Sequence, residues 1–247
     1  LVYFCLIIIH HIFLLTNTSI RMIFGYNTSH IGHHVFELQN KVVIQSKLNK
    51  PFNRFIKRTL DIALSSIFII LIAPLLFPIV SLIIVIESKG SAFFIQKRTG
   101  LKRKSFYCIK FRTMVKNKDA NRLQVQINDK RITKFGKILR ESHIDELPQV
   151  INVLIGDMSI VGPRPHMLRH NVEYANYSPN YHLRHMVKPG MTGLAQVRGF
   201  HGMILGKENF QNRLNSDIEY IKRWSFLGDI EIFILTTFKV IFKSNEK

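Results

Sequence analysis

The sequence has only two cysteines, and they lie far apart in its 247 residues, at Cys5 and Cys108. This excludes a disulfide framework and a metal site built on paired thiols, and it fits a reducing, cytosol-facing location. Acidic residues are also scarce, with 16 Asp and Glu against 35 Lys and Arg. The formal net charge of +19 predicts an anionic partner. Charge alone does not choose among nucleic acid, a phospholipid surface and a phosphorylated substrate.

The length suits one sizeable domain with an appendage. Residues 1–15 are apolar but reach only about 22 Å as a helix, which is short of a ~30 Å hydrocarbon core. The chain opens on Leu, so we interpret this piece as a truncated membrane segment or as upstream sequence read in from another start. Residues 16–53 are polar and predict a linker. We assign no function to residues 1–53.

The long apolar run, Ile62–Ile86, holds 25 residues without a charge and is long enough to cross a bilayer with tilt. Pro74 lies at its centre, where it removes a backbone hydrogen bond and leaves two halves of about 18 Å, each too short to span. Basic residues flank both ends, whereas a spanning helix carries its excess on one side. We therefore predict a re-entrant helix within residues 54–90, while a kinked spanning helix stays open.

A basic region follows, since residues 97–118 hold nine basic residues and no acidic one. A solvated patch without specificity is one interpretation. Within it, the stretch SFYCIKFRT alternates, which predicts a strand with an apolar face and a basic face. The apolar face holds Tyr107, Ile109 and Phe111, and the basic face holds Lys110 and Arg112. Two cations on one strand face predict a phosphate site. Further along, ITKFGKILR predicts a short helix that leads to Ser142.

An acidic pair, Asp145 and Glu146, stands in the stretch HIDELPQVINVLIGDMSIVGPRP. Apolar residues at i, i+3, i+4 and i+7 from Leu147 predict a helix that ends at Gly156. Pro148 is tolerated only near a helix start, so the helix begins close to the acids, with Asp145 or Ser142 as its cap. On one interpretation the pair is structural, a cap followed by a first-turn acid.

On the other interpretation the same geometry is chemical. A helix N-terminus lowers the pKa of a carboxylate and keeps it able to attack phosphorus. Adjacent helical residues point about 100° apart, so one acid can act as nucleophile and the other as metal ligand or base. Mg²⁺ and a nearby Arg would offset the repulsion between carboxylate and phosphate. Arg164, between two prolines, suits this because a guanidinium binds phosphate bidentately.

Taken in order, the motifs between residues 57 and 238 resemble those of the bacterial sugar transferases, the monotopic phosphoglycosyl transferases that act on a polyprenyl phosphate. The matching stretches are KRTLD (57–61), the Pro-broken apolar segment, IQKRTGLKRKSFYCIKFRTM (95–114), DKRITKFGKILRESHIDELPQVINVLIGDMSIVGPRP (129–165), KPGMTGLAQVRG (188–199) and YIKRWSFLGDIEIFILTTF (220–238).

The resemblance implies an α+β, mostly helical fold on the cytoplasmic face of the bacterial inner membrane. A re-entrant, Pro-broken membrane helix (54–90) would precede a cytosolic catalytic domain (91–247) with a small sheet and amphipathic interfacial helices. It implies transfer of a sugar 1-phosphate from a UDP-sugar to undecaprenyl phosphate, with release of UMP, as the priming step of glycan assembly. It also implies a requirement for Mg²⁺, contact with membrane lipid and no nucleic acid, and it leaves a homo-oligomer open.

By position in the motif, Asp145 would be the nucleophile that forms a covalent phosphosugar intermediate. Glu146 would bind Mg²⁺ and Arg164 the donor. Further expected contacts are Lys97, Arg98, Lys110 and Arg112 for phosphate or lipid headgroup, Gln196 and Arg198 for the donor pocket, and Asp157 as a second acid at the metal. In the membrane segment, Lys57, Arg58 and Asp61 would anchor the helix at the interface, where long basic side chains snorkel, and Pro74 would break it.

Other interpretations remain at this point. The net charge also fits a basic nucleic-acid-binding module, or a membrane-associated scaffold without catalysis. The stretch GFHGMILG (199–206) differs from the basic and acidic Gly-rich sequence that hexose-transferring relatives often carry, so the sugar stays open. The stretch Trp224–Phe242 is amphipathic, and it either lies in the headgroup layer or packs on the domain.

Overall fold

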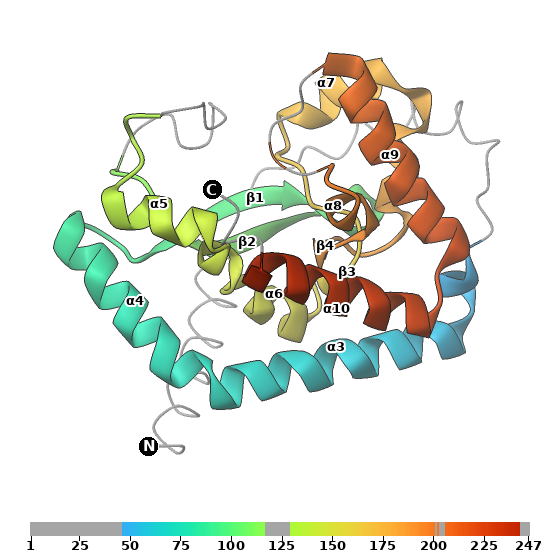
Figure 1. The fold of residues 1–247 in the computed structure, drawn as a ribbon. Coiled ribbons are helices and arrows are strands. Elements are labelled where there is room, and N and C mark those ends of the chain that lie inside the picture. The colour runs from blue at the N-terminus through green and yellow to red at the C-terminus, as the bar shows by residue number, and fades with distance from the viewer. Residues whose placement is uncertain (1–45, 117–128, 201, 203–205, 243–247) are drawn as a thin grey trace, which may run out of the picture. The chain divides into compact units, whose positions relative to one another are not determined.

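The computed structural model describes residues 46–116, 129–200, 202 and 206–242. Gln45–Lys247 form one compact unit, and the predictions for residues 1–45 lie outside the described residues. Figure 1 shows the elements, which in chain order are η1 (Lys47–Asn49), α3 (Pro51–Leu71), α4 (Ala73–Glu87), β1 (Phe93–Thr99), η2 (Leu101–Arg103), β2 (Ser105–Phe111), α5 (Lys134–Glu141), η3 (Ile144–Glu146), α6 (Gln149–Ile155), β3 (Ser159–Val161), α7 (His170–Tyr177), η4 (Pro179–Met186), β4 (Gly190–Thr192), α8 (Leu194–Val197), α9 (Gly206–Arg223) and α10 (Phe226–Phe242). The predicted mostly helical α+β fold is confirmed.

The apolar run forms two helices, α3 and α4, that meet at a bend of 63° (Figure 1). No single described helix is long and apolar enough to cross a bilayer, whereas this bent pair meets that measure by length and composition alone. The chain divides at Ile72, and Pro74 lies in the first turn of α4, where a missing N–H removes no helical bond. The predicted break at Pro74 with equal halves is therefore wrong in detail. α3 has 21 residues, about 31 Å, because it begins before the charged residues.

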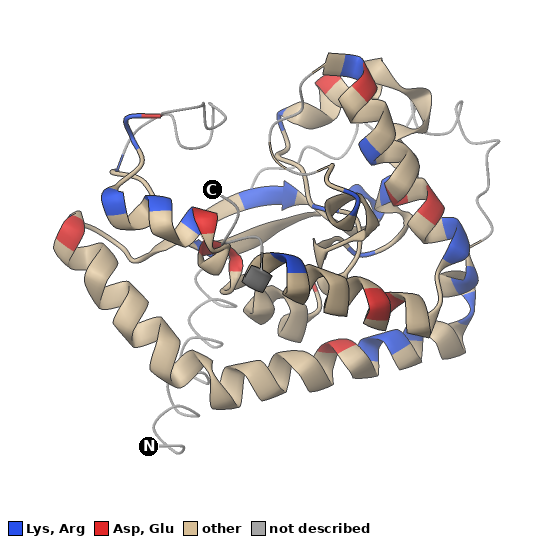
Figure 2. Ribbon diagram, viewed as in Figure 1, with Lys and Arg blue, Asp and Glu red and all other residues tan. Residues whose placement is uncertain are grey.

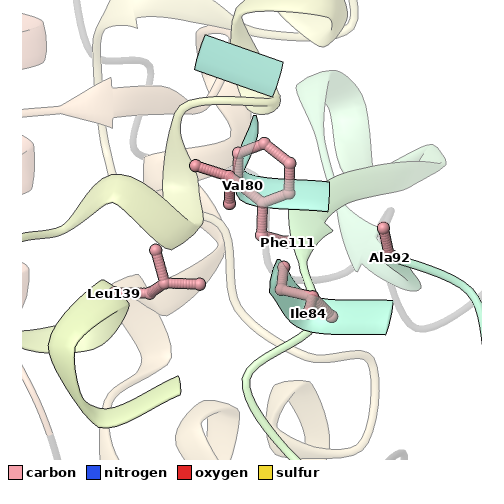
Figure 3. Close-up of a cluster of buried hydrophobic side chains, with 5 residues drawn as sticks. All are labelled: Val80, Ile84, Ala92, Phe111 and Leu139. Carbon is pink, nitrogen blue, oxygen red and sulfur yellow. The ribbon is translucent and has the colours of Figure 1, made fainter. Parts of the chain in front are cut away.

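α4 packs against the domain through one apolar stripe. Val80 and Ile84 lie in a buried cluster with Phe111 of β2 and Leu139 of α5, and Ala92 completes it (Figure 3). The opposite side of the helix is exposed, as at Leu75, Ile79 and Leu82. Figure 2 shows neither acidic nor basic residues along the second half of α3 or along α4 before its last turn.

The charged residues of α3 are held by protein. Lys57 and Asp61 are only 7% and 3% exposed, so the prediction that they reach a lipid interface is wrong. The Nζ of Lys57 lies 2.6 Å from Asp229 of α10 and 2.9 Å from the carbonyl of Val161. Asp61 accepts hydrogen bonds from the N–H of Ile160 and from a hydroxyl of β3. Because each charge finds a buried partner, it stays inside the fold.

Two small sheets complete the core. β1 and β2 pair antiparallel, and β3 and β4 pair parallel. The predicted strand is confirmed as β2, and Phe111 of the predicted apolar face is buried at 2% exposure. The face predicted to be basic also holds Phe106 and Cys108, which are buried at 8% and 1% exposure, so its description as a basic face is wrong. Lys110 lies on the same face of β2 as Phe106 and Cys108, and it points inward because Glu146 of η3 neutralises its charge. Arg112 follows the strand and turns away from Lys110 to the carbonyls of Ser88, Lys89 and Gly90 at the end of α4.

The C-terminal half covers the small sheets with helices. Tyr174, Tyr181, Phe210 and Leu214 form an aromatic cluster that joins α7, η4 and α9. α10 buries Asp229 and Ile232, while Leu227, Ile234 and Phe238 are exposed. Packing on the domain therefore accounts for one face of α10, and contact of the other face with lipid stays a prediction.

Candidate active site

Asp145 and Glu146 lie in η3, between α5 and α6. Ser142 ends α5, and His143 turns the chain in the left-handed conformation at φ 57°. α6 begins only after Pro148, which is its N-cap and supplies no side-chain hydrogen bond. The predicted cap at Ser142 or Asp145 is therefore wrong, because a 3₁₀ turn separates the acids from α6. The predicted end of α6 at a left-handed glycine is confirmed, at φ 97°.

Glu146 is bound by two cations that come from distant segments. Lys110 of β2 lies 2.6 Å from its Oε1, and Arg164 Nη1 lies 2.7 Å from its Oε2. The Nη2 of Arg164 donates to Oε1, so the guanidinium binds the carboxylate bidentately. Burial would raise the pKa of Glu146, but the charges of Arg164 and Lys110 outweigh it and hold that pKa well below its usual range. Glu146 is therefore the ionised member of the pair.

Asp145 has the opposite environment. It is 8% exposed, and among the described residues its carboxylate accepts no hydrogen bond. Burial raises its pKa, and the negative charge of Glu146 raises it further. The predicted lowering by a helix N-terminus is wrong, because η3 keeps Asp145 away from the α6 terminus. Two adjacent carboxylates with pKa values pushed apart are typical of sites where acids have different roles.

The loop that carries Arg164 is fixed through its main chain. Prolines 163 and 165 offer no N–H, yet the carbonyl oxygens of residues 163–166 each accept a hydrogen bond. The donors are, in order, the N–H of Gly190 (3.0 Å), Arg184 Nη2 (2.7 Å), Arg98 Nη1 (3.0 Å) and the N–H of Thr99 (3.1 Å). This arrangement holds the guanidinium of Arg164 in place against Glu146.

Three residues at the site escaped the sequence-based predictions, namely Arg184, Asp217 and Asn152. Arg184 is 3% exposed and pairs with Asp217 at 2.8 Å while it holds the Arg164 loop. Asn152 is fully buried, and its side-chain amide bonds the N–H of Ile109 and the carbonyl of Tyr107, which joins α6 to β2. No local pattern marks these residues, because each role arises from contact between distant segments.

A sequence model described as "Bacterial sugar transferase" matches residues 52–243. The chain belongs to the bacterial sugar transferase family. Among curated relatives, the UDP-glucose:undecaprenyl-phosphate glucose-1-phosphate transferase of Escherichia coli is 42% identical over 228 residues, which cover 91% of this chain and 49% of the relative. The Caulobacter vibrioides protein of the same name is 45% identical over 181 residues, which cover 73% and 67%.

The chain also matches the UDP-N-acetylgalactosamine-undecaprenyl-phosphate N-acetylgalactosaminephosphotransferase of Aeromonas hydrophila, at 38% identity over 192 residues, or 77% of this chain and 45% of the relative. The chain spans about half the length, or less, of several curated relatives that it matches. The names of these relatives include two different sugars.

In this member of the family the predicted site residues divide into two groups. The fold brings together Asp145, Glu146, Lys110, Arg164 and Arg98. The others make their contacts elsewhere: Lys97 lies over the ring of Tyr107, Arg112 binds the end of α4, Gln196 donates to the carbonyl of Met191, and Arg198 pairs with Glu219. Whether any of this second group meets substrate stays a prediction.

The fit of Mg²⁺ rests on oxygen ligands alone. Within the described ranges no three His, Cys, Asp or Glu side chains form a metal-binding group. Mg²⁺ needs only one or two carboxylates when phosphate oxygens supply other ligands. Glu146 fits, since its Oε2 accepts one of roughly two hydrogen bonds open to it. Asp157 does not join it, because α6, about 10 Å long, separates the two acids.

Proposed function

We propose that this protein transfers a sugar 1-phosphate from a UDP-sugar to undecaprenyl phosphate and releases UMP, as a priming step of glycan assembly. The observation that carries the proposal is the contrast within the acidic pair. Glu146 is occupied by Lys110 and Arg164, whereas Asp145 is buried with its oxygens free of hydrogen bonds from the described residues. A desolvated carboxylate with free lone pairs suits a nucleophile.

The proposed reaction has two displacements at one phosphorus. A carboxylate oxygen of Asp145 attacks the phosphorus next to the sugar, and the bond from that phosphorus to the UMP oxygen breaks as UMP leaves with the electron pair. An oxygen of undecaprenyl phosphate then attacks the same phosphorus. The bond to Asp145 breaks, which restores the carboxylate. Such a covalent route predicts ping-pong kinetics.

The cations around Glu146 are suited to bind the phosphates of the donor. Arg164 and Lys110 face the acid pair, and the bidentate geometry of Arg164 suits phosphate as well as carboxylate. We assign them to the donor diphosphate, with Arg98 holding the Arg164 loop. Glu146 would hold Mg²⁺ through its remaining lone pair. When bound, this ion neutralises part of the phosphate charge.

The donor and the location follow from the relatives and the apolar run. Most curated relatives that we name act on UDP-glucose by their names, and one acts on UDP-N-acetylgalactosamine. UDP-glucose is therefore the first donor to test. We place the protein at the bacterial cytoplasmic membrane, with α3 and α4 as a re-entrant pair and the site on the cytoplasmic face.

The test is release of UMP by membranes that carry the protein, given undecaprenyl phosphate, Mg²⁺ and a panel of UDP-sugars. We expect UMP from one or more donors, and a loss of at least about 10³-fold in Asp145→Asn. The control is Glu208→Gln, because Glu208 is exposed on α9 and lies outside the site. Its activity should equal that of the unaltered protein.

Two results would contradict the proposal. If no UDP-sugar yields UMP, the reaction is wrong. If Asp145→Asn retains full activity, the reaction stands but the nucleophile is wrong. Trapping of a labelled phosphosugar on the protein in the absence of acceptor, and its loss in Asp145→Asn, tests the covalent step directly.

A further inference from the structure

The two arms of the bent helix pair reach opposite ends of one segment. We define the acid-bearing segment as residues 133–156, which contain α5, η3 and α6 with Asp145 and Glu146 in the middle. α4 packs along α5, and α3 packs along α6 (Figure 1). A single charged side chain from each arm binds the outer end of the neighbouring helix.

At the first end, Glu87 is the last residue of α4 and caps α5. Its Oε1 accepts the N–H of Phe135 at 2.9 Å, and it also bonds the N–H of Lys134 and the hydroxyl of Thr133. The first N–H groups of a helix have no partner within the helix, and a negative charge there stabilises the helix through its interaction with the positive end of the helix dipole. The apolar contact of Ile84 with α5 supports the same junction (Figure 3).

At the second end, Arg58 of α3 caps α6. Its Nη1 lies 2.6 Å from the carbonyl of Val153 and its Nη2 lies 2.7 Å from that of Leu154. The last carbonyls of a helix lack partners within the helix, and a positive charge there is stabilising. The two arms therefore bind the segment by complementary charges, an acid at its N-terminus and a base at its C-terminus.

The partners of Glu146 divide between the same arms. Lys110 lies on β2, which is tied to α4 by the hydrogen bonds from Arg112 to the carbonyls of Ser88 and Lys89, directly after that helix. Arg164 follows β3, which α3 holds through Lys57 and Asp61. Glu146 thus bridges a group fixed to α4 and a group fixed to α3. Both β2 and β3 contact α6. A change in the angle between α3 and α4 therefore moves β2 and β3 relative to each other, and this alters how Lys110 and Arg164 face the acids.

We propose that the α3–α4 bend sets the position of the acid pair against Lys110 and Arg164, with Arg58 and Glu87 as positioning residues that couple catalysis to the surrounding bilayer. This inference rests on the proposed function. A bilayer whose thickness alters the bend alters the site, so the rate depends on the lipid.

The experiment compares Arg58→Ala and Glu87→Ala in vesicles of phosphatidylcholines with short, medium and long acyl chains. The matched controls are Arg54→Ala, an exposed base on the same helix, and Glu208→Ala, an exposed acid on α9. The measured quantities are kcat and the donor KM for UMP release. We expect kcat to fall by about tenfold in both test variants, because small misplacements of reacting groups are costly, with the donor KM within about twofold.

The dependence on lipid separates positioning from simple support of the fold. The unaltered protein should show an optimum of kcat with acyl-chain length, and the optimum should flatten in both test variants. Glu87→Gln should restore most of the rate, since an amide oxygen still accepts the N–H of Phe135. Arg58→Lys should restore part of it, since an ammonium keeps the charge without the bidentate geometry. These two variants also serve if an alanine variant fails to fold, as judged by circular dichroism.

Three results would overturn the inference: an unaltered protein whose rate ignores chain length, test variants that behave like their controls, or a reduced kcat whose dependence on chain length is unchanged. Each of these requires an unaltered protein that releases UMP. Absence of UMP from the unaltered protein with every donor instead contradicts the proposed function itself.

Discussion

Asp145 and Glu146 are neighbours in sequence, yet their surroundings push their pKa values in opposite directions. Glu146 meets two cations, and Asp145 meets burial and the charge of Glu146. The sequence contains the acids and the cations but not their pairing. The pairing depends on a strand and a loop that lie 36 and 18 residues away along the chain from Glu146. The sequence could therefore predict the two acids and some of the cations that gather at the site, but not which acid is left without a partner.

The raised pKa of Asp145 predicts a dependence on pH. In the proposed reaction only the carboxylate form of Asp145 attacks, so kcat/KM should rise with pH through a pKa above the ordinary value of 3.8. The contribution of Asp145 to the free energy of unfolding changes with pH in the opposite direction. A raised folded-state pKa favours the folded protein at low pH, and this contribution is lost as the pH rises through that pKa.

Asp145→Asn should therefore be more stable than the unaltered protein at neutral pH by about 1 kcal/mol, and the difference should vanish below pH 3.8. Denaturant unfolding in detergent at two pH values measures it. A variant that is less stable at neutral pH would show that the Asp145 carboxylate is compensated after all.

Glu146→Gln should destabilise the fold, because it leaves Lys110 and Arg164 without the carboxylate that binds both of them. The side chain of Glu146 is 16% exposed, so solvent screens part of the cost, and we expect about 2 kcal/mol. The control is Glu219→Gln, whose pair with Arg198 is 32% and 41% exposed and should cost less than about 1 kcal/mol. Equal losses in the two variants would contradict the assigned role.

At the scale of elements, packing decides the geometry of α3 and α4 more than Pro74 does. Pro74 lies where it is tolerated, and Pro74→Ala would gain one hydrogen bond, worth about 1 kcal/mol, only if the two helices became one straight helix. Burial of Val80 and Ile84 is worth about 1.5–3 kcal/mol each. We therefore expect Pro74→Ala to keep the bend.

Spin labels at Phe52→Cys and Ile86→Cys, both exposed positions, report the bend as a distance in a Cys5→Ser background. Pro74→Ala should change that distance by less than about 2 Å. A straight helix would lengthen it by about 7 Å from the helical rise and the 63° angle. We expect this lengthening only when Val80→Ala and Ile84→Ala are added. Lengthening in Pro74→Ala alone would mean that the proline maintains the bend.

Local patterns predicted the elements better than their ends. β2, α5 and the close of α6 at Gly156 follow from alternation, helical period and a left-handed glycine. The start of α6 did not, because η3 and the turn at His143 interrupt the pattern. The burial of Phe106 and Cys108 was also missed, since Lys110 on the same face of β2 indicates a basic face until the acid that pairs with it is known.

At the scale of the whole molecule, the charge is separated from the apolar surface. Figure 2 shows the basic residues on the domain and at the start of α3, while the bend itself carries none. The sequence predicted this separation because it follows directly from the order of charged and apolar residues along the chain. The coupling of the two arms to the acid-bearing segment was not predictable, since it depends on Arg58 and Glu87 reaching helices that are remote in sequence.

A re-entrant pair predicts that both ends of the α3–α4 unit meet the same face of the membrane. Lys50→Cys and Lys104→Cys are exposed positions before and after the pair, and Cys108 is only 1% exposed, so a Cys5→Ser background gives little unwanted labelling. In sealed, right-side-out vesicles, a membrane-impermeant thiol reagent should label neither position until the membrane is opened. Labelling of one position and not the other would indicate a spanning helix.

The loop of residues 163–166 has its carbonyl oxygens engaged by neighbouring segments, so its path does not depend on the side chain at position 164. A library of variants at Arg164 would sample new chemistry on an unchanged backbone. Under the proposed function, this loop is therefore a starting point for designing variants that bind altered donor diphosphates, with the rest of the fold left intact.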